Sequence, residues 1–183
     1  MKLGRIIIIT GSPGTGKSTA ASIIAKQSNL AKSVHMHTDD FYQYIQNGVI
    51  PPYLPEAQEQ NSIVIEAFLE AAKRFARGGY EVIIDGIVGP WFLKPWQKAV
   101  EEQYEVHYMI LRATKEETLL RAINREKLDE RTNISLVETM WDQFNHLERY
   151  EAHIVDTSNH TIEQTVAAIQ SGIEQKCYLL SLD

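Results

Sequence analysis

The chain has 183 residues, of which 44% are hydrophobic, so it is long enough for one sizeable core and too short for two domains of ordinary size. We therefore predict a single domain over residues 1–183. The formal net charge of -6 argues against nonspecific nucleic-acid binding, which needs an excess of Lys and Arg. The single cysteine, Cys177, excludes an internal disulfide and gives no sign of an oxidising compartment, so we expect a cytoplasmic protein.

The sequence predicts no membrane-spanning helix. Its first apolar run, Ile6 to Ile9, is far shorter than the roughly 20 residues that cross a bilayer. A Gly-rich loop follows that run where a signal peptide would have its cleavage site. We expect no membrane partner and no targeting segment, and either a monomer or a homodimer.

Strands and helices are predicted to alternate along the chain. Short apolar runs indicate five strands, at 5–10, 34–37, 81–85, 104–111 and 153–156. Apolar residues at helical spacing indicate helices at 17–27, 56–77, 115–127, 135–150 and 161–176, with shorter helical segments at 41–46 and just before Gln103. The alternation predicts an α/β protein, a three-layer α/β/α fold with a five-stranded, mainly parallel sheet.

The strongest motif is a phosphate-binding loop. Its sequence, Gly11-Ser12-Pro13-Gly14-Thr15-Gly16-Lys17-Ser18, matches G-x-x-x-x-G-K-[ST] in full, directly after an apolar strand and at the start of a helix. In such a P-loop the amides surround the phosphates, the lysine reaches the β and γ phosphates, and the hydroxyl ligates magnesium. We therefore predict a P-loop NTPase fold with ATP and Mg²⁺ as cofactors, bound by these eight residues and by Thr19.

A candidate catalytic base follows the second predicted strand. The segment His37-Thr38-Asp39-Asp40-Phe41-Tyr42 resembles the D-[DST]-[FYL] segment of chloramphenicol phosphotransferase, polynucleotide 5′-kinases and zeta-type toxin kinases, which are small P-loop kinases. The resemblance implies that Asp39 accepts the proton of the attacking hydroxyl. Asp40 is the alternative base, or else it caps the short helix that follows.

A second carboxylate ends the third predicted strand. Val82-Ile83-Ile84-Asp85-Gly86, in which three apolar residues precede an acid, resembles a Walker B strand. The resemblance implies that Asp85 orients Mg²⁺ through water or touches the acceptor, because hard cations take oxygen ligands. The alternative is a buried strand that ends in Asp before a turn.

Arginines spaced for one helix face lie further along. Arg121 and Arg125 are four residues apart and resemble the LID of the small P-loop kinases, which we place at about 115–135. The resemblance implies that Arg121 stacks on the adenine and that Arg125 reaches the phosphates, where it assists catalysis together with Lys17. Arg131 is a further LID candidate. The alternative is a solvated helix face with Glu and Arg pairs.

Two further groups of residues have less specific signals. His35 and His37 are expected on one face of a strand, and without an obvious third ligand we assign them a structural role and propose no transition-metal site. Candidate acceptor lining comes from the loop at 49–60 and from Trp91, Phe92 and Trp96. These aromatic residues follow the third strand and so lie at the carboxyl edge of the sheet, where α/β proteins bind ligands.

These patterns predict an ATP-dependent kinase that transfers the γ-phosphoryl group to a hydroxyl of a small molecule. The motifs of this chain most resemble those of chloramphenicol phosphotransferase and of the gluconate and shikimate kinases. Gly86 is followed by Ile87 and Val88 instead of the Pro-Arg of adenylate-kinase-like enzymes, and Tyr42 stands where polynucleotide kinases have Arg. The alternatives that stay open are a polynucleotide 5′-hydroxyl kinase and a non-catalytic ATP-binding regulatory module.

Overall fold

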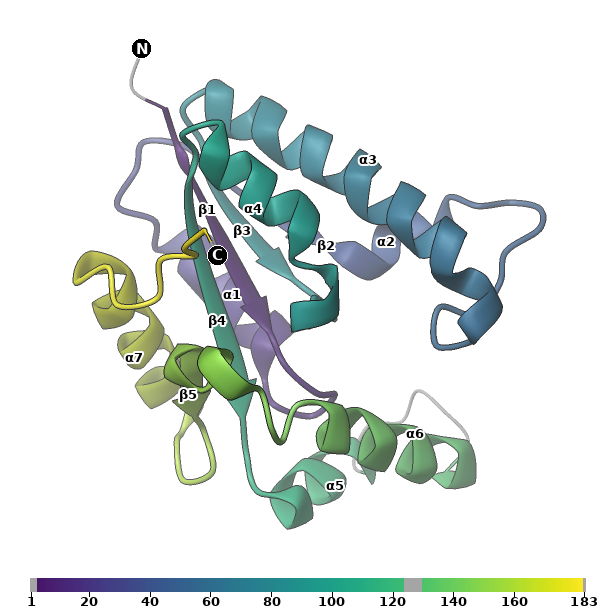
Figure 1. Ribbon diagram of the computed structural model, residues 1–183. Coiled ribbons are helices and arrows are strands. Elements are labelled where there is room, and N and C mark those ends of the chain that lie inside the picture. The colour runs from purple at the N-terminus through teal and green to yellow at the C-terminus, as the bar shows by residue number, and fades with distance from the viewer. Residues whose placement is uncertain (1–2, 124–129, 183) are drawn as a thin grey trace.

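The computed structural model describes residues 3–123 and 130–182, in which five strands form one sheet (Figure 1). The strands are β1 (Arg5–Thr10), β2 (Ser33–His37), β3 (Glu81–Asp85), β4 (Glu105–Arg112) and β5 (Ile154–Asp156). Their order is β2-β3-β1-β4-β5, and each neighbouring pair is parallel. The five-stranded parallel sheet is therefore confirmed, and the carboxyl ends of its strands meet at one edge.

Helices cover both faces of this sheet. They are α1 (Lys17–Lys26), α2 (Thr38–Gln43), α3 (Gln58–Arg77), α4 (Lys94–Glu101), α5 (Lys115–Ile123), α6 (Glu130–Gln143) and α7 (Ile162–Glu174). Short 3₁₀ segments lie at Pro55–Ala57, Pro90–Phe92 and Glu148–His153. Figure 1 shows α3 and α4 on one face, α1 and α7 on the other, and α5 and α6 beyond the carboxyl ends of the strands. The three-layer arrangement is confirmed.

The position of β1 in the centre of the sheet explains why apolar and polar residues do not alternate along this strand. Its four isoleucines are all fully buried. Ile6 and Ile8 pack in the core cluster that contains residues of α3 and α4, whereas Ile7 and Ile9 pack in the cluster that contains residues of α1 and α7. A strand covered on both faces has no solvent side, so an unbroken apolar run is what such a position requires.

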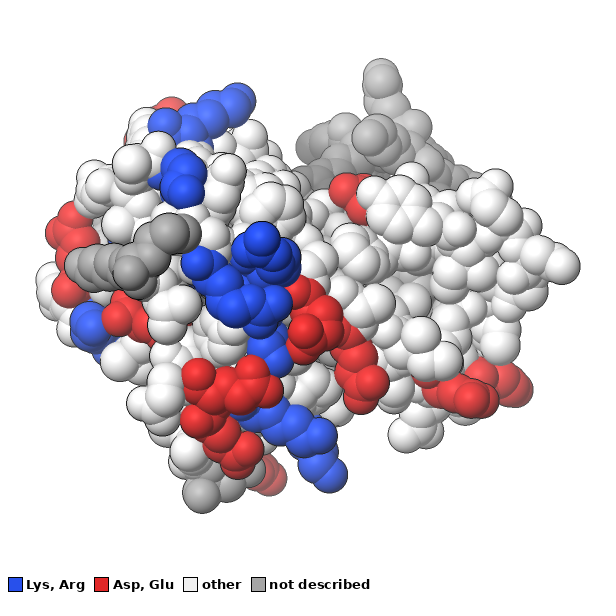
Figure 2. Space-filling view, turned by 90° about the horizontal axis from the view of Figure 1, so that it is seen from above, with Lys and Arg blue, Asp and Glu red and all other residues white. Residues whose placement is uncertain are grey.

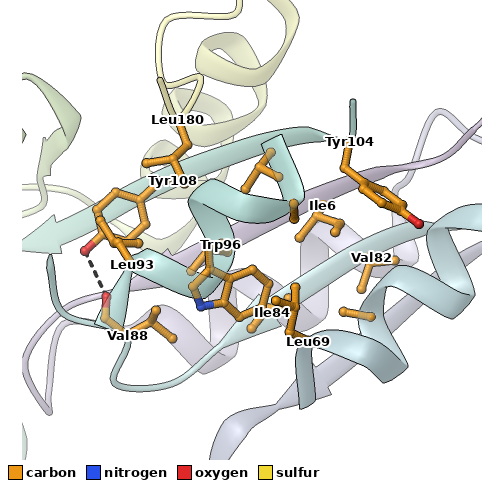
Figure 3. Close-up of a cluster of buried hydrophobic side chains, with 14 of the residues drawn as sticks. Ile6, Leu69, Val82, Ile84, Val88, Leu93, Trp96, Tyr104, Tyr108 and Leu180 are labelled. Carbon is orange, nitrogen blue, oxygen red and sulfur yellow. Dashed lines mark hydrogen bonds between the residues drawn. The ribbon is translucent and has the colours of Figure 1, made fainter. Parts of the chain in front are cut away.

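The core on the α3 and α4 side fixes the loop that follows β3. The Tyr108 hydroxyl donates a hydrogen bond to the backbone oxygen of Val88 at 2.8 Å, drawn as a dashed line in Figure 3. The backbone nitrogen of Val88 donates to the Thr10 hydroxyl at 2.9 Å, so both backbone polar groups of this buried residue are satisfied. The loop is thereby held against the end of β1 and the middle of β4.

One aromatic residue expected in the acceptor lining belongs to this core instead. Trp96 is fully buried in Figure 3, and its ring centroid lies 6.5 Å from that of Phe68 on α3. The assignment of Trp96 to the acceptor lining is therefore wrong. Trp96 lies on the face of α4 that packs on the sheet, and helix orientation is a tertiary property that the aromatic composition of the segment does not reveal.

The helix expected at 135–150 is displaced. The observed helix α6 begins at Glu130 and ends at Gln143, and a 3₁₀ segment begins at Glu148. After α6 ends, Phe144 is buried in the core and Arg112 donates a hydrogen bond to the backbone oxygen of Asn145 at 2.9 Å. These long-range contacts satisfy backbone groups that a continued helix would have used, so they end it early.

The surface seen from above in Figure 2 carries charges of both signs. Lys and Arg side chains there lie beside Asp and Glu side chains, and much of the right-hand part carries no charge. This face therefore lacks the one-signed basic surface that nucleic-acid binding favours.

No helix in the described part of the chain combines the length and the apolar character needed to cross a membrane.

Candidate functional site

The P-loop connects β1 to α1 at the carboxyl edge of the sheet. Gly16, at the N-cap of α1, has a left-handed backbone with φ of 88°, and its lack of a side chain leaves the first amides of the helix open to a ligand. The Thr15 hydroxyl donates to the backbone oxygen of Ser12 at 2.9 Å, and Lys17 Nζ donates to the same oxygen at 3.2 Å. The loop therefore has internal bonds that hold its curvature.

Asp85, at the end of β3, has a fully buried side chain with three hydrogen-bond partners. The Ser18 hydroxyl donates to its Oδ2. His35 Nε2 lies 2.6 Å from its Oδ1, and His37 Nδ1 lies 2.9 Å from its Oδ2. Burial alone would raise the pKa of Asp85, but the hydrogen bonds from His35, His37 and Ser18 outweigh it and hold this pKa well below its ordinary value. Asp85 is an anion next to the P-loop hydroxyl.

Asp39 is the second residue of α2, and 57% of its side chain is exposed. Its Oδ2 lies 3.3 Å from His37 Nε2. The hydrogen bond with His37 holds the pKa of Asp39 below its ordinary value, and the positive charge of Lys17 lowers it further. An ionised carboxylate thus lies within electrostatic reach of the P-loop lysine and is open to solvent.

Asp40 does not occupy the N-cap position of α2. The N-cap of α2 is His37, so Asp40 lies within the first turn of the helix. The interpretation of Asp40 as the capping residue is therefore wrong, because the helix begins three residues earlier than the sequence pattern indicated.

His37 bridges the two carboxylates. Its pKa rises from 6.5 to about 10, because it shares hydrogen bonds with Asp39 and with Asp85, whereas burial acts in the opposite direction. We assigned His35 and His37 a structural role from the sequence, and the structure brings both to the Asp85 side chain. Their spacing of two predicted a shared face, but only the parallel register, which aligns His37 with Asp85, shows what that face meets.

A cavity of about 430 Å³ lies on the other side of the P-loop. Its lining consists of Gly14, Thr15, Gly16, Arg121, His160, Ile162 and Thr165. Arg121 Nη2 donates to Glu117 at 2.5 Å and to the backbone oxygen of Thr157 at 3.4 Å, which holds the guanidinium at the cavity. The sequence analysis missed His160, whose Nδ1 is buried and has no hydrogen-bond partner within the described residues.

The structure leaves part of the predicted LID untested. Arg125 lies outside the described residues, and the side chain of Arg131 does too. Thr19 is exposed in the first turn of α1. The predicted roles of these residues therefore stay predictions.

The predicted acceptor side is formed by α2 and the segments around it. Burial, together with the charge of Asp39, raises the pKa of Tyr42 to about 12. In the loop beyond α2, the Gln60 side chain bonds both backbone groups of Ile50, at 2.8 and 2.7 Å. Trp91 is 49% exposed, and its ring centroid lies 5.5 Å from that of Phe144. Unlike Trp96, it has a free surface that a ligand can contact.

Comparison with known proteins agrees with this geometry. The family model described as AAA domain matches residues 7–156. No curated protein sequence matches the chain. Solved structures that it resembles include that of APE1195, with a TM-score of 0.71 and 21% identity over 97% of this chain and 98% of that one.

Two other similar structures are of proteins whose names indicate what those proteins do. A gluconokinase from Sinorhizobium meliloti 1021 has a TM-score of 0.67 and 15% identity, over 97% of this chain and 95% of that one. The tunicamycin resistance protein of Deinococcus radiodurans has a TM-score of 0.65 and 18% identity, over 98% and 99% of the two chains. At these identities the likeness concerns the fold. With a P-loop between β1 and α1 and a family match over most of its length, the chain belongs to the AAA domain family and has the fold of the small P-loop kinases.

Proposed function

We propose that the chain is an ATP-dependent phosphotransferase that moves the γ-phosphoryl group to a hydroxyl of an uncharged small molecule. The observation that carries the proposal is the position of Asp39. Its carboxylate is ionised, open to solvent and close enough to Lys17 for that charge to lower its pKa. A carboxylate next to the γ-phosphoryl position suits the uptake of a proton from an attacking hydroxyl.

Each of the other site residues has a role in this proposal. The loop amides and Lys17 would hold the phosphates and neutralise charge that develops on the γ-phosphoryl group. The cavity beside Arg121 would receive the adenine base of ATP. The Ser18 hydroxyl and the Asp85 carboxylate offer adjacent oxygen donors, which is the chemistry that Mg²⁺ prefers, and Asp85 is already ionised. Mg²⁺ held there would neutralise phosphate charge.

The charge around Asp39 supports an uncharged acceptor. No Lys or Arg occurs between Ser33 and Ala72 or between Gly78 and Leu93, the two stretches that contain α2, the loop beyond it and the loop after β3. Asp39, Asp40 and Asp85 all lie in these stretches. An anionic acceptor, such as a polynucleotide or a sugar phosphate, would need Lys or Arg partners that these stretches do not supply. Exposed rings such as Trp91 suit a neutral, partly apolar acceptor.

A transfer assay with γ-labelled ATP tests the proposal. The acceptors would be sugars, antibiotics, nucleosides and 5′-hydroxyl oligonucleotides, with Lys17→Ala as the inactive control. Label on a neutral small molecule supports the proposal, and label on oligonucleotides alone supports a polynucleotide kinase. Tight ATP binding with label on no acceptor supports a regulatory module.

A further inference from the structure

The geometry points to His37 as a positioning residue that holds the Asp39 carboxylate in one orientation by tying it to Asp85. The imidazole lies between the two acids, with Nε2 at 3.3 Å from Asp39 Oδ2 and Nδ1 at 2.9 Å from Asp85 Oδ2. The inference rests on the proposed function, in which Asp39 takes the acceptor proton. His37 itself contacts neither the acceptor nor the nucleotide in this account.

The bridge has one fixed end and one free end. Asp85 is fully buried and is bonded to Ser18 and to His35 as well as to His37, so its carboxylate has a single, well-supported position. Asp39 is more than half exposed, and its Oδ1 accepts only a long hydrogen bond, from the Thr38 hydroxyl at 3.4 Å. An exposed side chain with weak contacts samples several rotamers unless a partner holds it. His37 supplies that partner.

The chemistry of the bridge is specific for histidine. A residue that joins two carboxylates must present polar atoms in two different directions. His37 does this with one rigid ring, whose Nδ1 lies 2.9 Å from Asp85 Oδ2 and whose Nε2 lies 3.3 Å from Asp39 Oδ2. Because a misplacement of about 1 Å near the reacting atoms can cost about 100-fold in rate, a bridge that fixes Asp39 has a direct effect on turnover.

His35 provides the matched comparison. It lies on the same face of β2, and among the described residues its side-chain partner is Asp85, at 2.6 Å, and not Asp39. If the histidines act only by stabilising buried Asp85, the two positions are equivalent. If His37 positions Asp39, the positions differ in turnover while they resemble each other in stability.

Two substitutions at position 37 separate the ends of the bridge. The amide nitrogen of Asn is as far along the side chain as Nδ1, so His37→Asn keeps a donor for Asp85 and loses the one for Asp39. The amide nitrogen of Gln corresponds to Nε2, so His37→Gln keeps a donor for Asp39. Both variants are neutral, so the comparison is independent of the lost charge.

The experiment measures kcat, the KM for ATP and thermal stability in wild type, His37→Asn, His37→Gln and His35→Gln. We expect kcat of His37→Asn to fall about 100-fold with little change in the KM for ATP. We expect His37→Gln to recover about tenfold of that loss, and His35→Gln to lose much less activity than His37→Asn. Equal losses of kcat at positions 35 and 37, or no difference between Asn and Gln, would overturn the inference.

Crystal structures of wild type and His37→Asn give a readout that needs no activity. We expect the Asp39 carboxylate to face Lys17 in wild type and to lose a single defined orientation in the variant. An unchanged carboxylate in the variant contradicts the positioning role even if transfer is detected. A wild type that labels no acceptor contradicts the proposed function, and the comparison of the two structures still decides the role of His37.

Discussion

The Thr38 hydroxyl oxygen lies only 1.7 Å from the point where a Cβ atom on Gly86 would be. The turn after β3 thus touches the start of α2, and this contact limits how closely the backbones of these two segments approach. Gly86 also has φ of 147°, which side-chain-bearing residues rarely adopt.

Gly86→Ala is therefore expected to destabilise the protein and to lower turnover together, because α2 must move to make room. Gly48→Ala is the control, since Gly48 has φ of 74° but nothing within 4 Å of its added Cβ, so it carries only the backbone cost of about 1–2 kcal/mol. Urea unfolding of both variants measures this. A loss at Gly86 no larger than the loss at Gly48 would show that the contact is not tight.

Asp39→Asn is expected to leave the Kd for ATP nearly unchanged while kcat falls by about 10²–10⁴-fold, because the acceptor proton loses its destination. Isothermal titration and the transfer assay measure the two quantities. Asp40→Asn is the matched control within the same helical turn. If Asp40→Asn shows the larger loss of kcat, the base is Asp40.

Arg121→Gln is expected to weaken ATP binding about tenfold, because the guanidinium lines the cavity beside the P-loop and would stack on the base. Arg74→Gln, which removes the same charge from α3 on one face of the sheet, is the control and should bind ATP as wild type does. Equal Kd values for ATP in wild type and Arg121→Gln would show that this cavity does not bind the adenine base.

The contribution of His37 to stability should depend on pH in a defined window. Because its pKa is raised from 6.5 to about 10 in the folded protein, its stabilising effect is complete below about pH 6.5 and is lost as the pH rises through about 10. Without nucleotide or Mg²⁺, the difference in unfolding free energy between wild type and His37→Asn should be larger at pH 6 than at pH 10. A difference that grows with pH would mean that His37 is neutral in the folded protein.

The variants Trp91→Ala and Trp96→Ala should differ in stability. Trp96→Ala is expected to cost about 3–5 kcal/mol, because it leaves a cavity in the core cluster. Trp91→Ala should cost about 1 kcal/mol and alter the KM for the acceptor instead, since half of that side chain is exposed. Denaturant unfolding and acceptor titration separate the two effects.

The alternation of strands and helices and the position of the phosphate-binding loop could be predicted from the sequence. Both signals are local: an apolar run such as Ile6 to Ile9 requires cover on both faces, and a glycine-rich turn with Lys17 and Ser18 needs only its own backbone to bind phosphate. Asp39 and Asp85 were also found from local patterns, as acids at strand ends.

The way in which these acids are connected could not be predicted from the sequence, because it depends on the fold. The register that sets His37 beside Asp85, the burial of Trp96, the early end of α6 and the place of His160 in the cavity all depend on residues far apart in the chain. Strand order and helix rotation determine such contacts, and a pattern of neighbouring residues carries no information about either. Two histidines that looked structural in the sequence therefore lie at the candidate site.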